Sequence, residues 1–419
     1  MKTQSHRFLS ILTGSLWLLT IFHSSSQSWP QWLGPHRDGH AADFKAPSSW
    51  PKELTRQWTV EVGEGVATPA LAEGSLYVFS RQEGREIVRC MDADSGKERW
   101  RHEYESLGAT GPASRFSGPR SSPALLDGKL VTLGVRGVIS CLDAATGKLL
   151  WRKDDFAGAW PRFFSSSSPI LVDGMCLAQV GGGDKGGVVA YDLASGETKW
   201  SWTGDGPAYA SLSLLSLDVA RLVIAQTEGK MVALQATDGK SVWETEFAPE
   251  RRGYNAATPV VQGDTLYYAG SGRGTTAVKF EKSGDGFKTT ELWKNSDHSP
   301  QFNTPILHDG KLFGLSAGNE YFCVDAKTGQ TAWSFNPAGE NAEGGRRRGG
   351  GYGSIVSAGK VLLTLTPESR LTVLDPSADK YVALAQYTVS ENQTYAYPVA
   401  TGNRIYIKDQ DAVTLWRLE

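Results

Sequence analysis

The chain has 419 residues, which is enough to bury a large core without disulfides or structural metals. Its 43 Lys and Arg residues nearly balance its 45 Asp and Glu residues, and this balance excludes a general polyanion binder. The four cysteines, Cys90, Cys141, Cys176 and Cys323, are scattered singly, which excludes zinc-finger, thioredoxin-type and haem-attachment motifs.

The N-terminus has the order of a secretory signal peptide, which we assign to residues 1–28. Lys2 and Arg7 precede an apolar stretch over residues 8–22, and a small polar run follows it. The apolar stretch is short for a span of ~20 residues, so we expect cleavage and no membrane span afterwards. No Cys stands directly after this segment, so no lipoprotein anchor is expected. We therefore predict an exported protein, periplasmic or extracellular.

Eight hairpin turns recur along the rest of the chain at intervals of 43 to 54 residues. Each turn contains Gly or Asp and separates two runs rich in β-branched and apolar residues, which is a strong hairpin signal. The turns are Glu73-Gly74, Asp127-Gly128, Asp173-Gly174, Leu217-Asp218, Gly263-Asp264, Asp309-Gly310, Ala358-Gly359 and Gly402-Asn403. Such a period indicates a repeat fold.

A second marker follows each turn by about twenty residues, and Asp92 to Trp100 is its first copy. An Asp/Gly turn there leads into a strand whose Trp stands eight positions after the Asp. The fifth copy is stretched, and the seventh places Ala383 where the Trp would be. Four antiparallel strands per unit, with no helical apolar period, predict an all-β, eight-bladed β-propeller.

The two ends of the repeat region indicate how the ring closes. The last unit stops after three strands, whereas a Trp-bearing strand around Trp58 precedes the first unit. We therefore expect the N-terminal strand to complete the last blade, which removes the free sheet edges between them. The propeller would span residues 55–419, residues 29–54 would form an N-terminal extension, and we expect a monomer.

The repeated residues have structural explanations. A buried Trp removes roughly 150 to 250 Å² from water, so we expect these side chains to pack between blades rather than to form a ligand platform. They are Trp58, Trp100, Trp151, Trp200, Trp243, Trp293 and Trp333. The Asp should cap its own turn, and the Gly should supply a positive φ. Three of the cysteines stand where other units have Ala, and we read them as small buried thiols.

The loops that enter the first strand of each blade carry the candidate binding residues. These loops gather on one face of a propeller, and here they are rich in Arg, aromatic and amide side chains. The residues are Arg120, Arg162, Arg252, Tyr254, Asn303, Arg347, Tyr352 and Tyr397. Guanidinium groups beside aromatic rings suit a small anionic ligand or a partner protein. Ordinary solvated loops remain the alternative, and no nucleic-acid partner is predicted.

The repeated Ala-x-Asp-x-x-Thr-Gly-x-x-x-Trp pattern over residues 55–419 resembles the tryptophan-docking repeat of quinoprotein alcohol dehydrogenases, which use pyrroloquinoline quinone (PQQ). It is equally similar to their non-enzymatic relatives, including the propeller lipoprotein of the outer-membrane β-barrel assembly machine. The opening residues 29–39 resemble the start of many secreted bacterial PQQ-like propellers. The resemblance implies an eight-bladed ring and leaves the function open.

Two functions follow from the resemblance. The dehydrogenases need an adjacent Cys-Cys pair, a CxxCH haem segment and a Glu/Asn/Asp calcium set, and none of these is recognisable here. We therefore predict no catalytic residue, no metal site and no cofactor, and we favour a binding or assembly scaffold of the cell envelope that meets another envelope protein. The alternative is a PQQ-dependent oxidoreductase acting on alcohols or sugars, with PQQ and Ca²⁺ in a diverged site.

Overall fold

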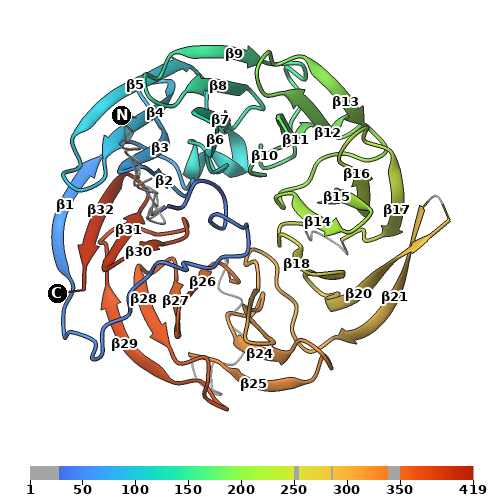
Figure 1. The fold of residues 1–419 in the computed structure, drawn as a ribbon. Coiled ribbons are helices and arrows are strands. Elements are labelled where there is room, and N and C mark those ends of the chain that lie inside the picture. Colours follow the sequence, from blue (N-terminus) through green and yellow to red (C-terminus); the bar gives the residue numbers. More distant parts are fainter. Residues whose placement is uncertain (1–27, 250–253, 285, 338–349, 419) are drawn as a thin grey trace, which may run out of the picture.

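The computed structural model describes residues 28–249, 254–284, 286–337 and 350–418, and these form a ring of eight four-stranded antiparallel sheets (Figure 1). The only helix in this described part is a short 3-10 helix, η1 (Gly111–Phe116). The predicted eight-bladed, all-β propeller is confirmed. The predicted signal peptide, apart from Ser28, lies outside the described residues.

Each blade runs from an inner strand at the ring axis to an outer strand at the rim. In the chain, η1 lies between blade 1 and blade 2. Blade 1 holds β2 (Ala70–Ala72), β3 (Ser75–Gln82), β4 (Arg85–Asp92) and β5 (Glu98–Glu105). Blade 2 holds β6 (Ala124–Leu126), β7 (Lys129–Leu133), β8 (Ile139–Asp143) and β9 (Leu149–Lys153). Blade 3 holds β10 (Ile170–Val172), β11 (Met175–Gly182), β12 (Lys185–Asp192) and β13 (Thr198–Trp202). Blade 4 holds β14 (Ser213–Leu217), β15 (Ala220–Gln226), β16 (Lys230–Gln235) and β17 (Ser241–Glu246).

The remaining blades repeat this order, and the last one borrows its outer strand from the start of the chain. Blade 5 holds β18 (Val260–Gln262), β19 (Thr265–Gly270), β20 (Gly274–Ser283) and β21 (Gly286–Asn295). Blade 6 holds β22 (Ile306–His308), β23 (Lys311–Leu315), β24 (Tyr321–Asp325) and β25 (Thr331–Phe335). Blade 7 holds β26 (Ser354–Ala358), β27 (Val361–Leu365), β28 (Arg370–Leu374) and β29 (Ala383–Thr388). Blade 8 holds β30 (Val399–Thr401), β31 (Arg404–Lys408), β32 (Ala412–Arg417) and β1 (Thr55–Glu61).

Ring closure occurs in blade 8, where β1 pairs antiparallel with β32. Val60 lies opposite Val413, and the hydroxyl groups of Thr59 and Thr414 are 3.0 Å apart. The predicted completion of the last blade by the N-terminal strand is confirmed. Six of the eight predicted hairpin turns coincide with the observed ones, whereas the turns of blades 4 and 7 lie one residue later, at 218–219 and 359–360.

Burial differs between the middle and outer strands, and this difference explains the sequence pattern. Most residues of β3 and β4 are buried on both faces because each blade is covered by its two neighbours. The outer strand β5 alternates between exposed and partly buried residues because one of its faces meets solvent. The middle strands are therefore continuous apolar runs, whereas the outer strands carry the charges.

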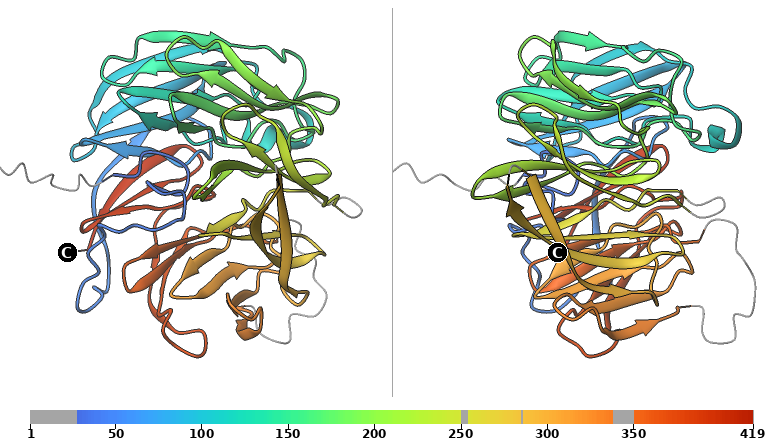
Figure 2. Two further views of the ribbon diagram at one scale, coloured as in Figure 1. Left: turned by 45° about the vertical axis from the view of Figure 1, so that its right-hand side comes forward. Right: turned by 90° about the vertical axis from the view of Figure 1, so that its right-hand side faces the viewer.

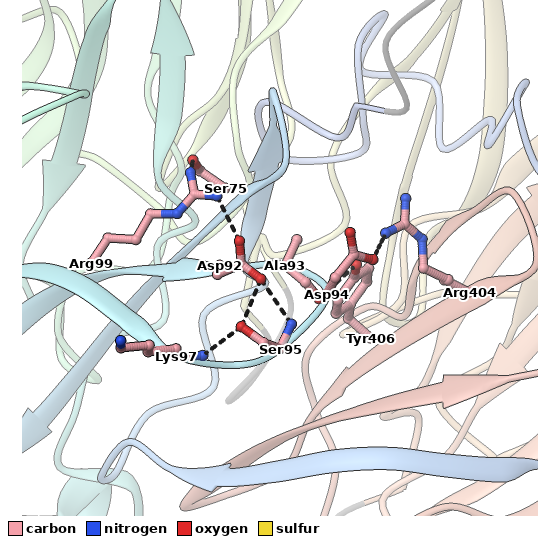
Figure 3. Close-up of polar contacts among 9 residues, drawn as sticks. All are labelled: Ser75, Asp92, Ala93, Asp94, Ser95, Lys97, Arg99, Arg404 and Tyr406. Atoms are coloured by element: carbon pink, nitrogen blue, oxygen red, sulfur yellow. Dashed lines mark hydrogen bonds and ion pairs between the residues drawn. The ribbon is translucent and has the colours of Figure 1, made fainter.

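The Asp/Gly turn closes the third strand of a blade and lies against the preceding blade (Figure 3). The Asp92 carboxylate accepts hydrogen bonds from the backbone N–H of Ser95 at 2.8 Å and from its hydroxyl at 2.7 Å. The pKa of Asp92 falls to about 2, mainly because of the hydrogen bonds from Ser95 and Arg99. Tyr406 of blade 8 donates a 3.1 Å hydrogen bond to the carbonyl of Ala93. The predicted role of the Asp as a turn cap is confirmed.

The repeated Trp side chains pack against the next blade along the ring, and all but Trp243 contact the turn after its third strand. Trp100 donates a 3.2 Å hydrogen bond from Nε1 to the carbonyl of Ala144, and its ring packs on Gly147. Gly147 has a φ of 74°, and an added Cβ there would lie 2.5 Å from the ring. Corresponding bonds join Trp151 to Leu193, Trp200 to Ala236 and Trp293 to Ala326. Trp58 lies on Gly96, Trp243 on Phe280 and Trp333 against Tyr381.

Blade 7 lacks this Trp, and the prediction that Ala383 takes its place is wrong. The pairing of β28 with β29 places Val373 opposite Ala385, in the register that elsewhere holds the Trp. Ala383, which the spacing from Asp375 predicted, pairs with Leu374 instead. The turn is two residues longer here because the N–H of Asp375 bonds to the carbonyl of Val382, seven positions on rather than five.

All four cysteines are buried free thiols, as predicted for Cys90, Cys141 and Cys323. Cys90, Cys141 and Cys323 lie opposite the Trp of the neighbouring strand, in the register that Ala190 occupies in blade 3. Burial raises the pKa of Cys141 to about 12 and that of Cys323 to about 11. These thiols therefore stay protonated and act as packing groups.

We expect Trp151→Phe to lower the free energy of unfolding by about 1–2 kcal/mol, since it removes the 3.1 Å bond to Leu193 and part of the buried ring. Leu150→Ala is the matched control because Leu150 precedes Trp151 on β9 and faces solvent. The control should change the free energy by less than about 0.5 kcal/mol. Urea unfolding followed by tryptophan fluorescence measures both, and equal losses would contradict the docking role.

Candidate functional site

The two faces of the ring differ in what covers them (Figure 2). We call the face that carries the loops entering each inner strand the upper face, and η1 lies on it. We call the face that carries the turns between first and second strands the lower face. The described part of the extension, residues 28–54, precedes β1 and lies on the lower face.

Residues 29–45, which we call the strap, cross the lower face through the middle of the ring (Figure 1). Their backbone bonds to the inner strands of blades 1, 2 and 7 and to the turn after the inner strand of blade 8. The bonds join Trp29 to Leu71 in blade 1, Pro30 to Leu125 in blade 2, Ala41 to Ser357 in blade 7 and Lys45 to Gly402 in blade 8. The lower end of the ring axis is therefore covered by the chain itself, and a candidate binding site has to be sought on the upper face.

Three strap side chains add contacts with blades 3, 4, 6 and 8. Arg37 donates from Nη1 to the carbonyl of Pro169 at 3.2 Å and from Nη2 to that of Leu212 at 3.0 Å. His40 lies 2.7 Å from the carbonyl of Leu307 through Nε2. The Trp32 ring meets Tyr397 edge to face, with centroids 4.6 Å apart. Arg37 thus places a guanidinium at the inner strands of blades 3 and 4.

A belt of hydroxyl groups joins the inner strands just above the strap. In blades 2 to 6 a Ser or Thr stands two residues before the inner strand, and in blades 3 to 6 its hydroxyl accepts a bond from the backbone N–H of its counterpart in the preceding blade. The bonds run from Ser122 to Ser168, Ser168 to Ser211, Ser211 to Thr258 and Thr258 to Thr304, at 2.9 to 3.1 Å. Tyr397 of blade 8 continues the belt past blade 7 by accepting from the N–H of Thr304 at 3.3 Å.

Seven aromatic rings surround the axis on the upper face, one from each of blades 2 to 8. They precede the inner strands by two to eight residues and are all partly exposed. They are Phe116, Phe163, Tyr209, Tyr254, Phe302, Tyr352 and Tyr395. We call these seven residues the collar. Because the belt lies below them and the loops hold them, the collar is the most distinctive feature of the uncovered face.

The collar consists of two arcs of rings in contact. On one side, Tyr254 meets both Phe163 and Tyr209 edge to face, with centroids 5.0 and 5.8 Å apart. On the other side, Tyr352 stacks on Phe302 at 4.2 Å and meets Tyr395 at 5.4 Å. Burial raises the pKa of Tyr352. Its phenol therefore remains a neutral hydrogen-bonding group at the centre of the face.

Three arginines accompany the rings. Arg120 donates from Nη1 to the carbonyl of Phe163 at 3.1 Å and from Nη2 to that of Phe116 at 2.7 Å, which ties the loops of blades 2 and 3 together. Burial lowers the pKa of Arg120 to about 10, and the guanidinium remains charged at neutral pH. Arg115 and Arg162 are exposed beside Phe116 and Phe163, at 5.5 and 5.6 Å from the ring centroids.

The predicted site residues divide into three groups. Arg120, Arg162, Tyr254 and Tyr352 lie together at the collar. Asn303 and Tyr397 are buried below it, and their polar groups bond to protein backbone: Asn303 to Gly353 and Leu315, and Tyr397 to Thr304. These two side chains therefore do not face a ligand, and we remove them from the site. Arg252 and Arg347 lie outside the described residues.

Sequence reasoning missed Tyr209, which lies in a loop without Arg. It placed the other collar residues in separate loops and did not identify them as one set of equivalent positions. An aromatic residue shortly before each inner strand is the signal that would have found them, but its distance from the strand varies from two to eight residues. This variation hides the equivalence in the sequence.

Among residues 28–249, 254–284, 286–337 and 350–418, no group of three or more His, Cys, Asp or Glu side chains could hold a metal ion. The belt below the collar supplies hydroxyl groups and no carboxylate. This donor set does not fit PQQ with Ca²⁺. In the same described part, no helix has the length and apolar character needed to cross a membrane.

Comparisons with known proteins give two groups of relatives. The chain is 24% identical over 296 residues to outer membrane protein assembly factor BamB of Yersinia pestis, covering 67% of this chain and 70% of that protein. It is 29% identical over 157 residues to the quinohemoprotein alcohol dehydrogenase of Comamonas testosteroni, covering 36% of this chain and only 22% of that enzyme.

Solved structures agree on the fold. The crystal structure of BamB from Moraxella catarrhalis superposes with a TM-score of 0.65 at 15% identity, covering 87% of this chain and 99% of that one. The Comamonas testosteroni dehydrogenase superposes with a TM-score of 0.69 at 15% identity, covering 94% of this chain and 80% of that one. The family model described as outer membrane protein assembly factor BamB matches residues 84–335, which is more than half of the chain. The protein therefore belongs to this family of PQQ-like β-propellers.

Proposed function

We propose that this protein is an exported, non-catalytic scaffold of the cell envelope that binds a partner protein through the collar. The observation that carries the proposal is the ring of seven partly exposed aromatic side chains on the one face that the strap leaves uncovered. Family membership supports it, since the name of the family model and of several relatives is that of an assembly factor.

The composition of the collar favours a protein partner. Tyr and Arg are enriched among the residues that dominate protein interfaces, because they offer large contact area together with a hydrogen-bonding group. The collar combines four tyrosines with the exposed guanidinium groups of Arg115 and Arg162. The carboxylates of Glu228 and Glu368 lie near its edge, and their negative charges contribute to the raised pKa of Tyr209 and of Tyr395, respectively. A site with both signs of charge at its margin suits a mixed polypeptide surface.

The two loops that carry Phe116 and Phe163 of the collar are packed against each other. Ala113 of η1 packs with Val135 and Phe164 in a small buried cluster, and Trp160 and Phe163 pack against it. The Arg136 guanidinium lies 4.7 Å from the Trp160 ring centroid and donates a 2.8 Å hydrogen bond to the carbonyl of Gly108. Since these loops are fixed in advance, binding loses little conformational entropy.

Site-specific photo-crosslinking in cells tests the proposal. A benzophenone amino acid placed at Tyr254 or at Tyr352 should give the same discrete protein adduct, because the two positions lie on opposite arcs of one face. Thr290, exposed on the outer strand β21, is the control position and should give no such adduct. Different adducts from the two collar positions, or the same adduct from Thr290, would contradict a collar-centred interface.

We expect Tyr254→Ala and Tyr352→Ala each to weaken binding of the identified partner by at least about tenfold, since anchoring aromatic residues contribute about 2 kcal/mol or more to an interface. Both side chains are partly exposed, so the melting temperature should change little. Surface plasmon resonance with the purified partner measures the affinity. Thr290→Ala is the matched control, and an affinity loss confined to the control would reject the site.

A PQQ-dependent oxidoreductase is the second candidate, and the similarity to quinohemoprotein alcohol dehydrogenases favours it. The described donor set does not fit the quinone with its calcium ion. We therefore expect no shift of the melting temperature with PQQ and Ca²⁺, and no dye reduction with alcohols or aldose sugars. Turnover above the rate of free PQQ would overturn the scaffold proposal.

A further inference from the structure

The guanidinium of Arg120 lies close to both arcs of the collar. Its Nη1 donates to the carbonyl of Phe163 at 3.1 Å, and the N–H of Phe163 donates to the hydroxyl of Tyr209 at 3.0 Å. Burial raises the pKa of Tyr209 and that of Tyr352, and the positive charge of Arg120 opposes the rise in both. Such an effect requires neighbouring groups. Arg120 is therefore near one phenol of each arc.

Tyr254 links the same groups. Its ring meets those of Phe163 and Tyr209 edge to face, with centroids 5.0 and 5.8 Å apart. After burial, its phenol is among the groups that raise the pKa of Tyr209 and of Tyr352. Four polar side chains from the loops that enter blades 2, 4, 5 and 7 thus surround one space. We call Arg120, Tyr209, Tyr254 and Tyr352 the central cluster.

The central cluster is rich in donors that have no acceptor. Three N–H groups of Arg120 bind backbone carbonyls in the loops of blades 2 and 3. Its Nε–H and the second N–H of Nη1 have no partner in the described part of the chain. The phenol proton of Tyr209 also lacks an acceptor among the described residues, because that hydroxyl only accepts from Phe163. The same is true of the hydroxyl protons of Tyr254 and Tyr352.

The positive charge of the cluster is not neutralised by the described residues. The titratable groups that act on Arg120 are the phenols of Tyr209 and Tyr352, and no carboxylate is among them. Burial lowers the pKa of Arg120 to about 10, so the charged group is already partly desolvated. A partner that docks on the collar would remove the remaining water from it.

This desolvation restricts the chemistry of the partner. Burying a charge without a counter-charge is strongly unfavourable. An amide or hydroxyl group of the partner could accept a hydrogen bond but would leave the guanidinium unneutralised. A carboxylate supplies negative charge and two acceptor oxygens at once, and it forms short, strong hydrogen bonds with guanidinium groups.

We propose that the partner protein places a carboxylate group in the central cluster, where its oxygens accept hydrogen bonds from Arg120 and from the phenols. This inference rests on the proposed function, because it is docking on the collar that covers the cluster. The carboxylate belongs either to an acidic side chain or to the C-terminus of the partner. Both have the same chemistry, and the test separates them.

The test uses the purified protein without a partner and three small probes, titrated at constant ionic strength and followed by ligand-detected NMR. Acetyl-aspartic acid amide carries only a side-chain carboxylate, acetyl-glycylglycine carries only a terminal one, and acetyl-asparagine amide is uncharged. At least one carboxylate probe should bind saturably in the millimolar range, and the uncharged probe should not. Binding of the first alone identifies an acidic side chain, and binding of the second alone a chain terminus; binding of both also supports the site.

Tyr352→Phe should weaken this binding by about tenfold, since it removes a donor to a charged group. The phenylalanine keeps the ring, and the lost hydroxyl has no partner among the described residues, so the fold should be unaffected. Tyr381→Phe is the matched control, because Tyr381 lies outside the collar and stacks on Phe335 of the outer strand β25. The control should bind the probes as the unchanged protein does.

Arg120→Gln should weaken the binding by about thirtyfold or more. Its matched control is Arg221→Gln, since Arg221 is exposed on blade 4 and pairs with Asp173. Because Arg120 also holds two loops together, Tyr352→Phe decides the matter if Arg120→Gln does not fold.

Three results would overturn the carboxylate site. One is the absence of saturable binding of both carboxylate probes, and another is equal binding of the uncharged probe. The third is the same probe affinity in the unchanged protein and in Tyr352→Phe. Since no partner is present, these results leave the crosslinking test of the collar unaffected, and the two proposals can fail separately.

Discussion

Replacing Trp29 by Ala is expected to lower the free energy of unfolding by about 3–5 kcal/mol, the usual cost of truncating a fully buried aromatic side chain. Trp29 is 1% exposed and is one of the largest buried side chains of the protein. It packs in the core cluster that combines residues of blades 1, 7 and 8, and its backbone pairs with Leu71. The strap thus fastens the blades on both sides of the closure.

His36→Ala is the matched control for this prediction because His36 lies in the same strap and is exposed. It should change the free energy by less than about 0.5 kcal/mol. Urea unfolding followed by circular dichroism measures both variants. If Trp29→Ala unfolds like the unchanged protein, the strap does not hold the ring, and its contacts with the inner strands contribute little to stability.

Lys408→Met is expected to destabilise the protein increasingly as the pH rises. Lys408 is 1% exposed, and the three N–H groups of its ammonium are shared among four backbone carbonyls at the closure, those of Gly63, Gly65, Asp409 and Gln410, at 2.6 to 3.3 Å. The Met side chain fills a similar volume but leaves these carbonyls without that donor. We expect a loss of about 2 kcal/mol at pH 7, since each unpaired carbonyl costs free energy and relief of the buried charge offsets part of it.

The pH dependence follows from the pKa of Lys408, which burial lowers from 10.5 to about 8. Between these values the unfolded chain holds the proton and the folded protein has released it, so the lysine-containing protein gains stability as the pH rises. The gap to Lys408→Met, which has no such group, should widen by about 2.5 kcal/mol between pH 7 and pH 10. Urea unfolding at several pH values measures it. A gap that is constant or narrows would reject a desolvated lysine.

The ring itself could be predicted from the sequence because its determinants are local. The caps formed by Asp92 and its counterparts, and the positive φ of glycines such as Gly147, depend on residues within one turn. The closure by β1 could be predicted from counting strands. The register of blade 7 could not, because two extra residues in the turn after Asp375 moved Ala385 into the position expected for Ala383.

The candidate site was predictable only in part because its residues are selected by distant contacts. Arg120 and Tyr352 stood out as an Arg and an aromatic residue in loops of the upper face. Asn303 and Tyr397 looked like equally good binding residues in the sequence. In the structure, however, their polar side-chain atoms form hydrogen bonds with backbone groups of other loops and blades. The strap carries no repeat, so nothing in its residues indicated that Arg37 would reach blades 3 and 4.

The pairing of β1 with β32 also constrains how the molecule can be made. Thr59 and Thr414 touch across 355 positions of chain. A polypeptide delivered from its N-terminus onwards keeps β1 without its neighbour until the final strand has arrived, and contacts so far apart in sequence form slowly. The nascent molecule therefore carries an open sheet edge for nearly the whole of its delivery, and losing a few terminal residues frees the first strand as well as the last.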